Sequence, residues 1–156
     1  MNNPIDKKIK ESFQEFASIE FDKKIDSSEI LISCGNMLIE ELKKQPNNGE
    51  ARYYAIRIAN ELHFVTKWMA YTKKYDTSPQ IKENYTIAFK LAHHYFELKP
   101  HSDLIPFIVK ILYYEQFNEE NNTSIITEIY KKCLDKLNTK TDKLNNSNRP
   151  WHAIDN

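Results

Sequence analysis

Apolar residues recur every three or four positions along almost the whole chain, and this spacing is the strongest constraint on its fold. The N-terminal segment places them at Ile5, Ile9, Phe13 and Phe16. The same spacing returns at Leu31, Cys34, Leu38 and Leu42. No segment sustains the strict alternation of a half-buried β-strand. The pattern predicts an all-α domain of about six helices joined by short turns, arranged as a bundle or a stack of helical hairpins.

Charged and helix-breaking residues divide the first half of this pattern. A charged connector, Glu20–Asp26, follows the first predicted helix. Asp26 and Glu29 have the spacing of a capping box and are expected to open the second helix, which Pro46 ends. Asn48 is the expected N-cap of a third helix that meets no breaker before residues 76–79.

Proline and asparagine residues mark the predicted helix ends in the second half of the chain. Pro79 is expected to begin a fourth helix that ends at Pro100, and Ser102 or Asp103 to cap a fifth. Asn118–Asn122 breaks the fifth helix and Thr123 begins a sixth, with one face formed by Ile126, Ile129, Cys133 and Leu137. We expect residues 1–138 to form a single domain and residues 139–156 to form a flexible polar tail.

Composition excludes several classes of function. The 156 residues contain only two glycines, whereas phosphate-cradling loops and dinucleotide-binding turns depend on glycine. Basic and acidic residues balance at 22 each, which argues against nucleic-acid binding through a general positive field. The N-terminus lacks the apolar run of a signal peptide, and no segment reaches the ~20 apolar residues of a membrane span. Cytoplasmic location and the absence of a membrane partner are therefore expected.

The histidines do not form a recognisable metal site. His93 and Glu97 share a predicted helix face, but Pro100 separates His101 from that helix. Glu-x-x-His and Cys-x-x-Cys pairs are absent from the sequence. We therefore expect no metal and no cofactor.

Two segments resemble parts of tetratricopeptide-type helical repeats. Residues 38–51, Leu-Ile-Glu-Glu-Leu-Lys-Lys-Gln-Pro-Asn-Asn-Gly-Glu-Ala, are similar to the boundary between successive repeats. Residues 88–100 are similar to the second helix of a repeat, with a small residue, Ala88, well before the closing Pro100. The interval from Pro46 to Pro100 does not divide into units of about 34 residues, and the signature tryptophan and Leu-Gly pair are missing. The resemblance implies a surface that binds a peptide or protein.

The third predicted helix carries two stripes of different character. One is an ordinary core stripe of Tyr54, Ile58, Leu62, Val65 and Met69. The other mixes aromatic rings with hydrogen-bonding groups: Tyr53, Arg57, Asn60, Phe64, Lys67 and Tyr71. Tyrosine and arginine are enriched where proteins bind each other, so this second stripe is the candidate partner-binding face. The alternative is that its aromatic rings pack on neighbouring helices while Arg57 and Lys67 extend into water.

Arg57 and His63 also resemble the Arg-to-His motif of HEPN ribonucleases, which are all-α proteins of similar size. The resemblance implies metal-independent RNA cleavage, with both side chains acting on the phosphate and His63 in acid–base chemistry. A six-residue separation places the two side chains roughly 120° apart around a helix. They would meet only through side-chain reach or with a second protomer. Ordinary surface pairing, for example with Glu61, is the alternative.

Together these features favour a protein–protein interaction module without enzymatic activity. The partner is expected to be another protein, for example a toxin or effector. A bacterial or phage immunity protein that occludes a toxin is the first expectation, followed by an adaptor or a chaperone. The competing hypothesis is the HEPN-like ribonuclease that uses Arg57 and His63. The sequence specifies neither the partner nor the oligomeric state.

Overall fold

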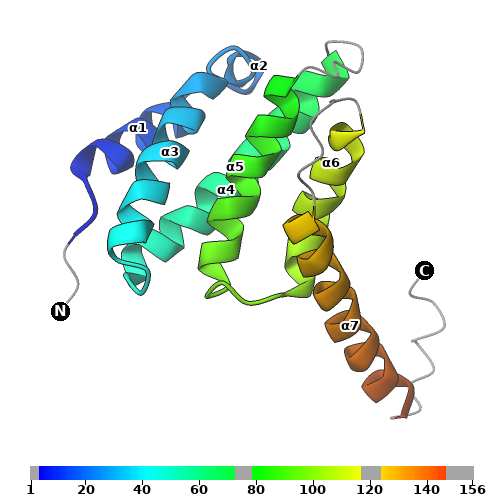
Figure 1. The fold of residues 1–156 in the computed structure, drawn as a ribbon. Helices are drawn as coiled ribbons and strands as arrows, with labels where there is room; N and C mark the ends of the chain where they lie inside the picture. The colour runs from blue at the N-terminus through cyan, green and yellow to red at the C-terminus, as the bar shows by residue number, and fades with distance from the viewer. Residues whose placement is uncertain (1–3, 73–78, 117–123, 147–156) are drawn as a thin grey trace.

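The structure is a computed structural model that describes residues 4–72, 79–116 and 124–146. Within those ranges the chain forms helices and turns and no strand, which confirms the all-α prediction. The helices stack side by side in chain order (Figure 1). They are α1 (Lys7–Ala17), α2 (Phe21–Lys24), α3 (Ser28–Lys44), α4 (Gly49–Thr72), α5 (Pro79–Tyr95), the 3₁₀ helix η1 (Ser102–Leu104), α6 (Ile105–Glu115) and α7 (Ser124–Asn146).

The predicted connector at residues 20–26 contains a short helix, and the predicted capping box is wrong. α2 occupies Phe21–Lys24, and α3 begins at Ser28, one residue later than the box requires, with Ser27 rather than Asp26 as its N-cap. Backbone bonds explain the shift, since the Ser27 and Ser28 amides already donate to the carbonyls of Lys24 and Ile25. The amides at the start of α3 therefore do not need the Asp26 side chain.

The junction between α3 and α4 forms as predicted. The Asn48 side-chain oxygen accepts from the Glu50 and Ala51 amides, at 3.0 and 3.2 Å, and so caps α4. The Glu50 carboxylate in turn pairs with Lys10 at 2.7 Å and accepts from the Ile5 amide at 3.2 Å. The start of α4 is thereby fixed against α1. The described part of α4 has 24 residues, roughly 36 Å at 1.5 Å per residue, and its predicted end near residue 76 lies outside the described residues.

α5 ends at Tyr95 rather than at Pro100, so that predicted boundary is wrong. The chain leaves the helix through Glu97 and Leu98, both with φ of 60°, and their amides bond back to His94 and His93. This is a Schellman-type ending built without glycine. The Arg52 guanidinium donates to the Tyr95 carbonyl at 2.9 Å and to the Glu97 carboxylate at 3.1 Å, which ties this ending to α4. The interval between Pro46 and Pro100 thus holds one helix pair, α4 and α5.

The later helices differ from prediction at their ends. η1 precedes α6. The N-cap of η1 is His101, rather than Ser102 or Asp103, and its ring accepts from the Asp103 amide at 3.2 Å. α7 continues to Asn146, past the predicted domain boundary at residue 138. Its Cys133 is buried, whereas Leu137 is 40% exposed because α7 extends away from the other helices there (Figure 1). The rest of the predicted tail, residues 147–156, lies outside the described residues.

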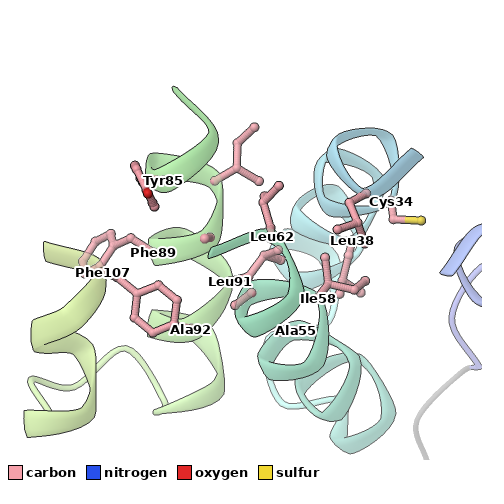
Figure 2. Close-up of a cluster of buried hydrophobic side chains, with 14 of the residues drawn as sticks. Cys34, Leu38, Ala55, Ile58, Leu62, Tyr85, Phe89, Leu91, Ala92 and Phe107 are labelled. Carbon is pink, nitrogen blue, oxygen red and sulfur yellow. The ribbon is translucent and has the colours of Figure 1, made fainter. Parts of the chain in front are cut away.

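Small residues let the central helices approach closely. Figure 2 shows Leu38 of α3, Ile58 and Leu62 of α4 and Leu91 of α5 meeting in one core. At Gly35 an added Cβ would lie 3.0 Å from the Ile87 side chain and 3.4 Å from that of Leu91. Both close distances are to α5, so the absence of a side chain at position 35 lets α3 approach α5 closely, while Ile58 of α4 lies at an ordinary contact distance of 3.9 Å.

This close approach predicts opposite effects for substitutions at the two glycines. Gly35→Leu should lower the free energy of unfolding by about 1–3 kcal/mol, because the new side chain overpacks the seam. Gly49→Ala should raise it by about 0.4–1 kcal/mol, since an added Cβ would meet no atom within 4 Å and the backbone φ of Gly49 is not positive. Urea denaturation of both variants tests this. Equal effects of the two substitutions would contradict the proposed seam.

Candidate functional site

The predicted partner-binding face lies on the solvent side of α4. Each of its residues is exposed: Tyr53, Arg57, Asn60, Phe64, Lys67 and Tyr71. The opposite stripe enters the core, with Ile58 and Leu62 fully buried, Val65 and Met69 nearly so, and Tyr54 half-buried. The two stripes thus separate as the sequence predicts.

Arg57 is held in place by aromatic rings rather than by an acid. Its guanidinium carbon lies 4.9 Å from the centre of the Phe13 ring on α1 and 5.4 Å from that of Tyr53. The same guanidinium donates to the Tyr53 hydroxyl at 3.2 Å. Such cation–π contacts contribute about 0.5–1 kcal/mol at exposed sites, so Arg57 is positioned while its charge stays accessible.

An exposed cluster of aromatic side chains extends the face onto α2. We call Phe21, Phe64, Trp68 and Tyr71 the aromatic patch. Phe21 lies 6.0 Å from Phe64 and 6.1 Å from Trp68, between ring centres. Trp68 also contacts Phe64 and Tyr71, at 6.3 and 5.8 Å. The four side chains nevertheless remain 60%, 44%, 38% and 63% exposed, in the order given.

Sequence reasoning found half of this patch. Phe64 and Tyr71 belong to the predicted face, whereas Trp68 and Phe21 were not predicted. Trp68 stands four residues after Phe64, a spacing that places both on one side of a helix. Phe21 gave a weaker signal, because it is the single aromatic residue within the charged run from Glu20 to Asp26.

The structure separates the side chains of the ribonuclease hypothesis. Arg57 packs towards α1, whereas the His63 ring lies between Tyr85 of α5 and Phe107 of α6, at 5.4 and 5.0 Å. The Nε2 atom of His63 is buried and has no partner among the described residues. A phosphate contacted by Arg57 would therefore not reach the His63 imidazole of the same chain.

The other histidines also pack as aromatic rings. His93 stacks on Phe89 and His101 on Phe96, with ring centres 5.4 and 4.1 Å apart. Among residues 4–72, 79–116 and 124–146, no group of three or more His, Cys, Asp or Glu side chains is placed to hold a metal ion. None of the helices described is long and apolar enough to cross a membrane.

Burial lowers the pKa of three histidines. Desolvation is the main cause for His63, His93 and His94, and the charges of Lys110 and Lys67 add to it for His63. In the unfolded chain these groups return towards the ordinary value of 6.5. Below that pH the unfolded state binds protons that the folded state does not, so acid favours unfolding.

We therefore expect the free energy of unfolding to decrease as the pH falls from about 7.5 to about 5.5. His63→Phe keeps an aromatic ring between Tyr85 and Phe107 and removes the titrating group. This variant should lose less stability over the same pH interval, as measured by urea denaturation at both ends. An unchanged pH dependence in the variant would show that His63 is protonated as readily in the folded state as in the unfolded state.

Comparison with known proteins gives no family assignment. No protein-family model matches the chain, and no match was found among curated proteins or solved structures.

Proposed function

We propose that the protein is a non-enzymatic binding module whose aromatic patch, together with Arg57 and Lys67, holds one protein partner. The single observation that supports this proposal most strongly is the exposure of four rings in mutual contact. Monomeric proteins expose single apolar side chains routinely, but contiguous exposed patches are typical of interaction sites. The resemblance of residues 38–51 to a tetratricopeptide repeat boundary supports the same class, because repeats of that kind build surfaces for peptides and proteins.

The shape of the patch favours a macromolecule over a small ligand. Beside Phe21, Phe64 and Trp68, the space left between the rings and α2 is only about 10 Å³. Small-molecule pockets have volumes of about 300–1,000 Å³. Rings that close on one another in this way instead offer a surface on which a partner's apolar side chains can pack.

Charge indicates the chemistry of the partner. Arg57 and Lys67 flank Phe64 on the same face, and neither forms an ion pair within the described part of the chain. The half-buried Glu61 is the acidic residue beside them on α4. A partner segment with apolar side chains flanked by Asp or Glu would pack on the rings and pair with both cations. A bacterial or phage immunity protein bound to a toxin is the specific form of this proposal, and it rests on size and composition.

The partner would be identified by affinity capture, purified and then titrated directly against the wild-type protein and its variants. Phe64→Ala and Trp68→Ala should each weaken binding by roughly tenfold or more, as hot-spot residues do. Ile125→Ser is the matched control, because Ile125 is a 68% exposed apolar residue on α7. It should leave the affinity unchanged. Circular dichroism and thermal midpoints should confirm that each variant is folded.

Several outcomes would contradict the proposal. One is a captured protein that binds the patch variants as tightly as the wild type, and another is the failure to capture any protein. A patch occupied by a second copy of the chain would also contradict it. In that case sedimentation would show a homodimer that Phe64→Ala dissociates.

A further inference from the structure

A pocket of about 400 Å³ lies beside the aromatic patch, between the C-terminal half of α4, the first half of α5 and α6. Its described lining is Lys67, Trp68, Ala70, Tyr71, Tyr85, Lys110 and Tyr114. This volume falls within the range of about 300–1,000 Å³ found for small-molecule sites. Unlike the nearly filled space beside Phe21, it can hold a ligand of one or two rings.

Aromatic side chains form much of the pocket's lining. Trp68 and Tyr71 lie on α4, with ring centres 5.8 Å apart, and Tyr114 projects from α6. Tyr85 of α5 stacks against Tyr114 at 5.6 Å, with an interplanar angle of 28°. A planar aromatic ligand could therefore contact rings on both sides of the pocket.

The Tyr85 hydroxyl is a polar group left without a partner. Tyr85 is fully buried and lines the pocket, yet its hydroxyl forms no hydrogen bond with any described residue. Buried hydroxyls are normally hydrogen-bonded, and an orphaned one requires an explanation. Burial and the neighbouring Tyr114 raise the pKa of this phenol, so it keeps its proton and can donate it.

Two lysines supply positive charge at the same place. Lys67 enters the lining from α4 and Lys110 from α6. Both side chains line the pocket, so each can bring its ammonium group to an anion held there. Neither lysine is ion-paired among residues 4–72, 79–116 and 124–146.

We propose that this pocket binds a small aromatic anion. Its ring lies between the walls formed by Trp68, Tyr71 and Tyr114. Its carboxylate or phosphate accepts from the Tyr85 hydroxyl and pairs with Lys67 and Lys110. This inference does not depend on the proposed protein partner, although Lys67, Trp68 and Tyr71 belong to both sites.

The fluorescence of Trp68, which lines the pocket, can report the binding of a ligand. The sequence has two tryptophans, Trp68 and Trp151, so Trp151→Phe leaves Trp68 as the single tryptophan. In this background the full chain would be titrated with indole-3-acetate and with phenyl phosphate while binding is followed by ligand-observed NMR, and by Trp68 fluorescence for phenyl phosphate. Indole-3-acetamide is the matched uncharged probe. At least one anion should bind with a dissociation constant of about 1 mM or tighter, and the amide at least about fivefold more weakly.

Three variants test the individual contacts. Lys110→Gln and Lys67→Gln should each weaken binding of the anion by roughly fivefold or more, and added salt should reduce the affinity of the wild type. Tyr85→Phe should weaken binding by a similar factor while leaving the thermal midpoint of the ligand-free protein unchanged or higher, because it removes an orphaned hydroxyl. Lys90→Gln, an exposed change on α5 outside the pocket, is the control and should bind like the wild type.

The proposal would be overturned if neither anion bound, if the neutral amide bound as tightly, or if all three pocket variants retained full affinity. Phe21→Ala separates this site from the protein-binding patch. Phe21 belongs to the patch and does not line the pocket, so its loss should spare the binding of the anion. Conversely, Tyr85 lines the pocket and does not belong to the aromatic patch, so Tyr85→Phe should spare the binding of a protein partner.

Discussion

The close approach of α3 to α5 at Gly35 is the constraint on which the rest of the structure depends. An added Cβ at position 35 would lie 3.0 Å from the Ile87 side chain and 3.4 Å from that of Leu91, so these side chains would have to shift to admit a larger residue. The alanines at positions 55, 59, 88 and 92 are fully buried in the same core. Because small residues bring these helix backbones together, one face of α4 is buried against its neighbours along its described length. The other face is left to solvent.

That division leaves α4 with the two surfaces that we propose as binding sites. Its solvent face carries the predicted Tyr53–Tyr71 stripe, to which α2 adds Phe21. Near the C-terminal end of α4, Lys67, Trp68 and Tyr71 also line the pocket that α5 and α6 complete. The proposed protein-binding patch and the proposed small-molecule pocket thus lie next to each other on α4. Arg57 and Arg52 strengthen this arrangement, since the first packs on α1 and the second ties α4 to the end of α5.

Helical periodicity was sufficient to predict the fold class, the core face of α4 and the Asn48 cap, because each is set by residues close in sequence. Features that depend on contacts between helices could not be predicted in this way. The Schellman-type ending at Glu97 and Leu98 uses non-glycine residues, and Arg52, which bonds to it, is distant in sequence. His63 lies beside the exposed Phe64 on the helix, yet α5 and α6 cover its ring. Phe21 was missed for the same reason, since it joins the aromatic patch from α2, whereas Trp68 follows Phe64 by four residues and could have been predicted from helical spacing.

We propose that the aromatic patch binds the protein partner, and site-specific photo-crosslinking tests this proposal most directly. A photoreactive phenylalanine analogue would replace Phe21 in the patch or, as a control, Val109, which is 44% exposed on α6. In cells that produce the protein, the analogue at position 21 should yield one discrete protein adduct, and the analogue at position 109 should yield none. A discrete adduct from position 109 together with none from position 21 would contradict the account.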